Sequence, residues 1–195
     1  MDLQTRAARV RLILFDIDGV LTDGKILLHA DGTESKQFDI RDGILIVWAQ
    51  RLGLTVGLLS ARSSATTTER AAQLGITLIH QGVASKLGTY EEILRHQALS
   101  DAEVAYMGDD LLDLPVLARV GLSAAPSDAV EDVRGRVHWV SRSPGGNGAV
   151  RELLEVVLRA QGRWAELLAS FLQEPTVSGA GQAPHEEGKV KRSRQ

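Results

Sequence analysis

The sequence predicts an α/β protein with a doubly wound, Rossmann-like parallel sheet. Short apolar runs alternate along the chain with longer segments of helical period. Strands separated by helices of this length imply right-handed crossovers, which give a parallel sheet covered by helices on both faces. The chain has 195 residues, enough for one domain with a single core. One segment interrupts the alternation and predicts a hairpin.

The elements follow one another in a regular order. The short apolar runs predict strands at Val10–Asp16, Leu54–Ser60, Ile76–His80, Val104–Met107, Gly121–Ala124 and Val137–Val140. The segments of helical period predict helices at Gly43–Leu52, Ser64–Leu74, Lys86–Gln97, Leu111–Val120, Asp128–Arg134, Ala149–Gln161 and Trp164–Leu172. The stretch PGGNG opens the helix at Ala149.

The segment KILLHADGTESKQFD, residues 25–39, breaks this rhythm. It has two semi-apolar runs around Ala30-Asp31-Gly32, and Asp-Gly is a strong hairpin signal. A β-hairpin is therefore expected to project after the first strand. About 40 residues separate Asp18 from Ser60 and about 25 separate Ser60 from Lys86, fewer than the roughly 50 of a small domain. No separate cap domain is expected.

The chain divides into a folded part and a tail. Residues 1–172 carry the alternating pattern and form the expected single domain. Residues 173–195 are polar, rich in glycine and proline, and nearly free of large apolar side chains. Such a segment cannot offset its ordering entropy, so a disordered tail is expected.

The composition excludes several classes of protein. The formal net charge of −3 gives no global reason to bind nucleic acid or an anionic membrane. The absence of cysteine excludes disulfides and thiolate metal sites and fits a reducing cytoplasm. The apolar run before Asp16 has about five residues, fewer than the roughly 7 to 15 of a signal core, and no stretch approaches the ~20 apolar residues of a membrane span. We expect a cytoplasmic protein with a small soluble ligand.

Polar and charged residues follow the strands of the predicted sheet, where the ligands of doubly wound sheets bind. An aspartate or serine there is often only a helix N-cap, and a lysine is usually a solvated surface residue. Together, however, these residues supply every charge type that one reaction requires. They are Asp16, Asp18, Ser60, Arg62, Lys86, Asp109, Asp110 and Asp113.

That reaction is phosphoryl transfer. A carboxylate can attack phosphorus and form an aspartyl-phosphate, which splits a difficult hydrolysis into two steps. A second acid protonates the leaving alkoxide and later deprotonates water. Mg²⁺ suits carboxylate and water ligands and separates the anionic nucleophile from the phosphate, with Asp109 as a further ligand. A lysine and a hydroxyl then hold the phosphoryl oxygens.

The motifs DIDGVLTDG, the serine of LLSAR, Lys86 and GDDLLD together resemble those of the haloacid dehalogenase-like phosphatases. The resemblance implies that Asp16 is the nucleophile and Asp18 the general acid/base. It implies that Mg²⁺ is held by Asp16, the backbone carbonyl of Asp18, and Asp109. It also implies that Ser60 and Lys86 hold the phosphate, while Asp110 and Asp113 orient the metal waters and Lys86.

The stretches FDIRDG, SARSS, HQGVASK and SPGGNGAVRE resemble more specifically the 3-deoxy-D-manno-octulosonate 8-phosphate phosphatases, from about Val10 to Gly162. This resemblance implies a capless homotetramer whose hairpins form a central barrel. It implies a sugar-acid phosphate as substrate, in lipopolysaccharide biosynthesis. Arginines pair well with carboxylates and phosphates, and the implied substrate contacts are Arg62, Arg70, Asp39, Arg41, Asp42 and Gly43.

Departures from the family pattern leave the sugar acid open. Leu45 stands where the family usually has glycine, Val47 where it has a basic residue, and His80 where it has tyrosine. The enzymatic alternative is therefore a phosphatase for another nonulosonic acid phosphate, such as a sialic-acid-like 9-phosphate.

Two alternatives are not enzymes. A receiver-like switch also uses a doubly wound sheet, a phosphorylatable aspartate, Mg²⁺, a hydroxyl and a lysine. Asp18 argues against it, because hydrolysis needs that acid and a switch avoids it. A non-catalytic homo-oligomeric scaffold is disfavoured because no motif acid is missing.

Overall fold

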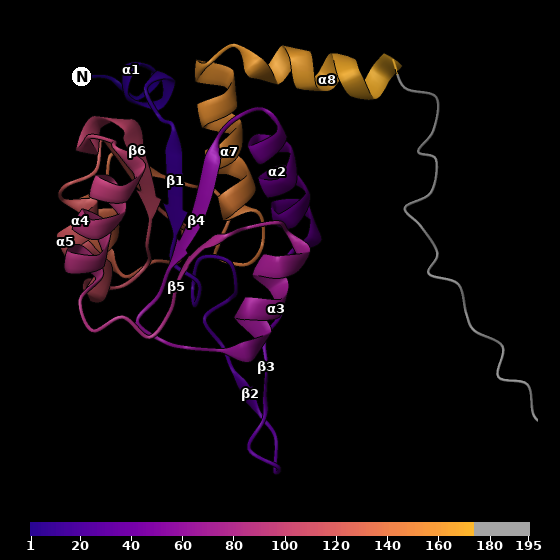
Figure 1. The fold of residues 1–195 in the computed structure, drawn as a ribbon, viewed down its shortest axis with the longest axis vertical. Helices are drawn as coiled ribbons and strands as arrows, with labels where there is room; N and C mark the ends of the chain where they lie inside the picture. Colours follow the sequence, from indigo (N-terminus) through magenta and orange to yellow (C-terminus); the bar gives the residue numbers. More distant parts are fainter. Residues whose placement is uncertain (174–195) are drawn as a thin grey trace, which may run out of the picture.

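The computed structural model describes residues 1–173, and Figure 1 shows a central sheet with helices on both sides. The sheet has the strand order β5-β4-β1-β6-β7-β8, and every neighbouring pair is parallel. Its strands are β1 Leu12–Phe15, β4 Thr55–Leu59, β5 Leu78–His80, β6 Val104–Met107, β7 Leu122–Ala125 and β8 Trp139–Val140. The doubly wound α/β prediction is confirmed. The expected tail lies outside the described residues, apart from Gln173.

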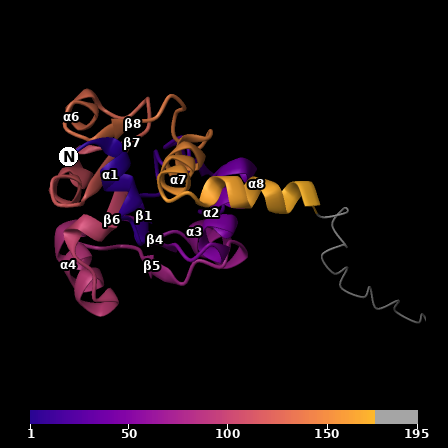
Figure 2. The ribbon, with the colours of Figure 1, turned by 90° about the horizontal axis from the view of Figure 1, so that it is seen from above.

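Helices cover both faces of the sheet. They are α1 Leu3–Ala8, α2 Ile40–Arg51, α3 Ala65–Gln73, α4 Lys86–Gln97, α5 Leu114–Leu117, α6 Glu131–Arg134, α7 Ala149–Ala160 and α8 Arg163–Gln173, with 3-10 turns η1 Asp101–Glu103 and η2 Leu111–Asp113. Figure 2 shows α4 and α6 on one side of the sheet and α2, α3 and α7 on the other. Among the described helices, none combines the length and apolar character that crossing a membrane would require.

The central strand β1 shows why two layers of helices are needed. All four of its residues are buried, as in parallel sheets covered on both faces. Side chains alternate along a strand, so Ile13 and Phe15 join the core beneath α2 and α7, while Leu12 and Leu14 join the core beneath α4 and α5. An apolar run without polar alternation is thus explained by burial on both sides.

Some helix boundaries differ from those expected. Helix α2 begins at Ile40 rather than Gly43, because the Asp39 carboxylate accepts a hydrogen bond from the Arg41 N–H and caps the helix. The helix expected at Leu111–Val120 is instead the 3-10 turn η2 followed by the short α5, with Pro115 in its first turn. The expected helix Asp128–Arg134 begins only at Glu131. Helix α1 was not predicted; Asp2 caps it by accepting from the Thr5 N–H.

The predicted hairpin is confirmed. Strands β2 Leu27–Leu28 and β3 Glu34–Ser35 pair antiparallel, with Leu27 opposite Ser35 and Leu28 opposite Glu34. The turn between them includes Gly32, whose φ of +84° favours glycine. The hairpin projects from the carboxyl end of the parallel sheet (Figure 1). No separate cap domain accompanies it in residues 1–173.

Candidate active site

The sheet reverses its winding direction between β1 and β6. Asp16 directly follows β1, Asp109 lies two residues beyond β6, and the two strands are neighbours. The crevice at such a reversal is the usual ligand site of a doubly wound sheet. A cavity of about 260 Å³ opens there, and it is lined by Asp16, Asp18, Gly24, Ser60, Ala61, Arg62, Lys86, Asp109, Asp110, Leu112 and Asp113. The fold thus brings the predicted chemical groups to one place.

Asp16 is held at the bottom of this crevice. Its backbone N–H donates to the carbonyl of Met107, which continues the pairing of β1 with β6. Its carboxylate is mostly buried, and Oδ1 lies 3.0 Å from the Nζ of Lys86. Lys86 is the first residue of α4, so the start of this helix places the ammonium group beside Asp16 at the end of β1. The arrangement fixes one carboxylate oxygen and leaves the residue at the cavity wall.

Asp113 organises the groups around Lys86. Its Oδ1 lies 2.6 Å from the Lys86 Nζ and accepts a hydrogen bond from the Tyr106 hydroxyl. Its Oδ2 accepts from the backbone N–H groups of Asp109 and Asp110, at 2.9 and 3.2 Å. The carboxylate is fully buried, and such a group is stable only when hydrogen-bonded and paired. The structure places Asp113 against Lys86; that it orients the lysine in the reaction stays a prediction, and Tyr106 was not predicted.

Burial and crowding shift the protonation of the acids. Burial, followed by the charge of Asp113, raises the pKa of Asp16 to about 6. Burial, followed by the charges of Asp16 and Asp113, raises the pKa of Asp109 to about 8. Burial by itself disfavours the charged form of Lys86, but Asp16 and Asp113 outweigh it and raise the pKa of the lysine. The site therefore has more carboxylates than its one lysine can neutralise.

This surplus of negative charge fits a divalent cation. Oxygens of Asp16, Asp109 and Asp113 lie within 4.8 Å of one another. Both oxygens of Asp113 are already engaged, whereas Oδ1 of Asp109 is buried without a hydrogen-bond partner. Carboxylates with a free oxygen are what Mg²⁺ binds. Asp16 and Asp109 are thus the side chains available as ligands.

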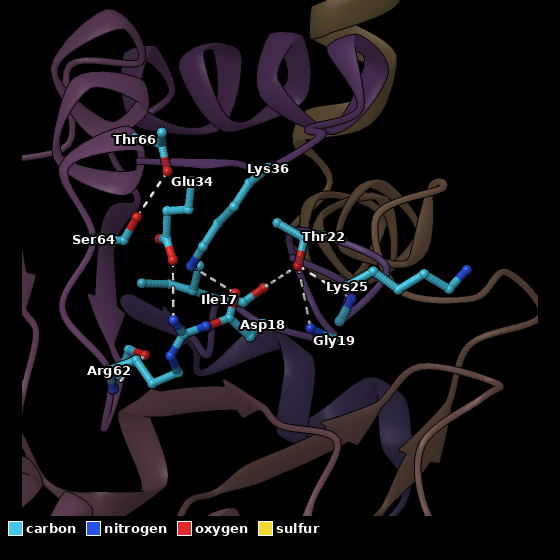
Figure 3. A network of polar contacts seen from close by, with 12 residues as sticks. Ile17, Asp18, Gly19, Thr22, Lys25, Glu34, Lys36, Arg62, Ser64 and Thr66 are labelled. Atoms are coloured by element: carbon cyan, nitrogen blue, oxygen red, sulfur yellow. Dashed lines mark hydrogen bonds and ion pairs between the residues drawn. The ribbon is translucent and has the colours of Figure 1, made fainter. Parts of the chain in front are cut away.

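Asp18 also lines the cavity, and a tight turn follows it directly. Gly19 makes this turn with φ of +93°, a conformation that other residues rarely adopt. Figure 3 shows two cations directed at the Asp18 carboxylate: Lys36 Nζ lies 2.6 Å from Oδ1 and Arg62 Nη1 lies 3.4 Å from Oδ2. Arg62 also pairs with Glu34 at 3.1 Å.

Lys36 and Glu34 were not predicted as site residues. They belong to the second half of the hairpin, and their signal in the sequence was only the E-x-K spacing after Asp31-Gly32. That spacing places both side chains on one side of a strand, but nothing local indicates that this side faces Asp18.

Ser60 and Asp110 complete the cavity. The Ser60 side chain is buried at the end of β4, and its Oγ accepts a hydrogen bond from the backbone N–H of Arg62 at 3.2 Å. The hydroxyl proton therefore remains to be donated to a ligand in the cavity. The Asp110 carboxylate accepts from the Leu111 N–H and starts the turn η2.

The remaining predicted substrate contacts do not line the cavity. The buried Asp42 carboxylate accepts hydrogen bonds from the backbone N–H groups of Gly148, at 3.2 Å, and Arg151, at 2.8 Å, at the start of α7. Arg41 pairs with Asp39 and also donates to the Asn147 side chain. These contacts tie the first turn of α2 to the loop before α7.

Arg70 lies against α2. Its guanidinium lies over the Phe38 ring, 5.9 Å from the centroid. A Cβ at Gly43 would overlap the guanidinium, so the missing side chain at position 43 leaves room for Arg70. Within one chain, the structure does not bring Arg70 or Gly43 to the cavity wall.

The loop PGGNG supports the nucleophile loop. A Cβ at Gly145 would overlap the Gly19 carbonyl, and one at Gly146 would overlap the backbone of Thr22. The Gly146 N–H donates to the Val20 carbonyl at 2.9 Å. The glycines are therefore explained by close packing of two backbones.

The comparisons with known proteins agree with this geometry. Residues 54–153 match the family model of the haloacid dehalogenase-like hydrolases. The 3-deoxy-D-manno-octulosonate 8-phosphate phosphatase KdsC of Escherichia coli (strain B / BL21-DE3) is 41% identical over 165 residues, which are 85% of this chain and 88% of the relative.

Two solved structures extend the agreement to the fold. That of the Yersinia pestis 3-deoxy-D-manno-octulosonate 8-phosphate phosphatase has a TM-score of 0.83 and 41% identity, covering 84% of this chain and 89% of its own. That of the Moraxella catarrhalis enzyme of the same name has a TM-score of 0.85 and 33% identity, covering 87% and 97%. The Moraxella structure is a complex with a magnesium ion, a phosphate ion and a KDO molecule.

Proposed function

Because the chain belongs to the haloacid dehalogenase-like hydrolases and, within them, to the 3-deoxy-D-manno-octulosonate 8-phosphate phosphatase family, we propose that it hydrolyses 3-deoxy-D-manno-octulosonate 8-phosphate to the free sugar acid and phosphate. One observation carries the chemistry. The buried Asp16, paired with Lys86, faces the same cavity as Asp18 and Asp109. This is the set of groups that two-step phosphomonoester hydrolysis requires.

The residues have separate roles in the reaction. The Asp16 carboxylate attacks phosphorus, and Asp18 gives its proton to the departing sugar alkoxide. Asp18 then takes a proton from water, whose oxygen displaces the Asp16 carboxylate from phosphorus. Lys86 and the Ser60 hydroxyl hold phosphoryl oxygens, since most of the rate comes from positioning and charge stabilisation.

Mg²⁺ is the cofactor. Asp16 and Asp109 would hold it, together with the backbone carbonyl of Asp18, and Asp110 would orient its waters. When bound, it neutralises charge on the phosphoryl oxygens and the attacking carboxylate. Asp113 keeps Lys86 in place through the contacts described above.

The departures at positions 45 and 47 do not favour another substrate. Leu45 is 3% exposed and Val47 packs against the same core, so neither side chain lines the cavity. Arg62 lies at the cavity wall and does not contact the nucleophile. Beside its contacts with Asp18 and Glu34, its half-exposed guanidinium keeps N–H donors for an anionic sugar acid.

The test is phosphate release by the purified full chain. We expect turnover of 3-deoxy-D-manno-octulosonate 8-phosphate that needs Mg²⁺ and stops with EDTA, with a kcat/KM well above that for a sialic-acid-like 9-phosphate. Asp16→Asn should abolish it, whereas Asp23→Asn, in the same loop but paired only with the exposed Lys25, should not. Full activity of Asp16→Asn would overturn the mechanism. A stable, stoichiometric phosphoryl label without turnover would indicate a switch instead.

We also propose that the chain forms a homotetramer through its hairpins. Leu27 and Leu28 on β2 are 62% and 73% exposed, which is unusual for neighbouring leucines and marks an interaction surface. A cavity of about 350 Å³ at the hairpin base makes this surface concave. It is lined by Asp23, Lys25, Ile26, Leu27, Ser35 and Gln37. Light scattering should give four times the chain mass, and Leu28→Glu should reduce it.

A cytoplasmic role in lipopolysaccharide biosynthesis belongs to the same proposal. The cysteine-free sequence suits a reducing compartment. Cell fractionation checks the location. Accumulation of the sugar-acid phosphate after deletion of the gene checks the role, and its absence would contradict it.

A further inference from the structure

We propose that Lys36, on the hairpin, is a positioning residue for the general acid/base Asp18, and that the hairpin is therefore a working part of the active site of its own chain. The inference rests on the proposed function and deepens it. The juxtaposition that carries it is the 2.6 Å ion pair between Lys36 Nζ and Asp18 Oδ1.

The burial of Lys36 sets it apart from an ordinary surface lysine. Its side chain is 1% exposed, and in residues 1–173 Asp18 is its one ion-pair partner. Lys25, at the other end of the hairpin segment, pairs with Asp23 but is 85% exposed. Burying an ammonium group is costly unless a carboxylate compensates it. Forming the Lys36–Asp18 pair therefore costs hydration free energy that an exposed pair would keep.

Lys36 and Arg62 each contact one oxygen of Asp18, Lys36 through an ion pair at Oδ1 and Arg62 through a longer contact of 3.4 Å at Oδ2. Lys36 approaches Oδ1 from the hairpin, and Arg62 approaches Oδ2 from the loop after β4. Glu34, two residues before Lys36, holds Arg62 in turn. Figure 3 shows this arrangement, with Glu34 and Lys36 side by side and both directed toward the Asp18–Arg62 pair. A carboxylate held from two sides has little freedom to leave the position from which it must transfer protons.

Lys36 is not itself a catalytic residue. It does not line the cavity, so it touches neither phosphate nor leaving group. Its effect passes through Asp18, which donates a proton when the bond from phosphorus to the alkoxide oxygen breaks, and recovers one from water when the bond from phosphorus to Asp16 breaks. A proton donor matters for a sugar alkoxide, which is a poor leaving group, and much less for p-nitrophenolate, which is a good one.

Comparing substrates with a poor and a good leaving group therefore shows whether Lys36 positions Asp18 or only stabilises the fold. Lys36→Met should lower kcat on the sugar-acid phosphate by roughly 100-fold, as expected for loss of acid/base catalysis, while KM changes less than about threefold. With p-nitrophenyl phosphate and Mg²⁺, the variant should still release a rapid burst of one p-nitrophenolate per active site, followed by slow turnover. Arg136→Met, which removes an exposed cation paired with Asp132 far from the hairpin, is the control and should behave as the wild type. Lys36→Arg, which keeps the cation, should recover most of the lost kcat.

Several results would overturn the inference. The first is a wild-type kcat in Lys36→Met. The second is a burst of p-nitrophenolate in Lys36→Met that falls by the same factor as its steady-state turnover. The third is a Lys36→Arg variant that recovers no activity. Lys36→Gln, which keeps a polar group at the site, is made alongside in case the methionine variant does not fold, and the same burst and kcat decide it. A wild-type enzyme that hydrolyses neither substrate with Mg²⁺ would instead refute the proposed function, so the two failures are distinguishable.

Discussion

Gly19 lies directly against the carboxylate of Asp109, so closely that a Cβ atom at position 19 would overlap Oδ2. The two residues come from the loops after β1 and β6, and their contact borders the crevice between these strands. The glycine thus has two reasons to be there: its φ of +93° lets the chain turn directly after Asp18, and its missing side chain leaves room for Asp109.

We predict that Gly19→Ala damages the metal site beyond its effect on the backbone. The apparent Mg²⁺ constant for activity should rise at least tenfold and kcat should fall, because the Asp109 carboxylate must move. Gly32→Ala is the control, since Gly32 also has positive φ but no atom within 4 Å of its Cβ position. It should cost about 1 kcal/mol of unfolding free energy and leave the Mg²⁺ dependence unchanged. Equal Mg²⁺ constants in the two variants would contradict the prediction.

Asp113→Ala should be strongly destabilising as well as inactive. It would leave the buried Lys86 without its 2.6 Å partner and two backbone N–H groups without an acceptor. Breaking a buried ion pair from one side costs about 3 to 5 kcal/mol. Tyr106→Phe removes the hydroxyl that donates to the same carboxylate and accepts a long hydrogen bond of 3.4 Å from Lys86, and should cost about 1 to 2 kcal/mol. Urea unfolding measures both, and similar losses in the two variants would show that Asp113 is not the centre of the network.

The stability of the metal-free protein should fall as the pH rises. Asp16 and Asp109 have folded-state pKa values raised to about 6 and about 8 from 3.8. The folded state therefore holds these protons more tightly than the unfolded state does. The corresponding stability is fully present below about pH 4 and is lost as the pH rises through these values.

Mg²⁺ should reverse this trend, because it favours the ionised carboxylates. The rise in Tm on adding Mg²⁺ should be larger at about pH 8.5 than at about pH 5, since less proton release then opposes binding. Calorimetry in buffers of different ionisation enthalpy should detect the released protons below pH 8. In Asp109→Asn most of this dependence should vanish; its persistence would place the titration elsewhere.

Asp42→Asn tests whether this residue contacts substrate. The carboxylate is 1% exposed and caps the start of α7 through Gly148 and Arg151. The amide nitrogen of asparagine cannot accept, so one of these two hydrogen bonds is lost, which should lower the unfolding free energy by about 1 kcal/mol, with KM for the sugar-acid phosphate unchanged. A raised KM at wild-type stability would favour the substrate contact that the family resemblance implies.

The local patterns of the sequence were sufficient for the sheet, the hairpin and the chemical groups. Apolar runs and helical periods placed every strand of the parallel sheet, and motif residues at strand ends placed Asp16, Asp18, Ser60 and Lys86 at one edge. They failed where a boundary depends on a partner far along the chain. The helix expected from Leu111 is broken because Asp113 turns inward to meet Lys86 and Tyr106.

The sequence by itself determined the fold class and the reaction, because the alternation of strands and helices and the identity of the reacting groups follow from short-range pattern and residue chemistry. Only the tertiary structure decided which partners hold those groups. The pairing of Lys36 with Asp18, the close contact of Gly19 with Asp109 and the capping of α7 by Asp42 each join segments that are distant in sequence. Such contacts depend on how helices and loops pack in three dimensions, and no local periodicity records that packing.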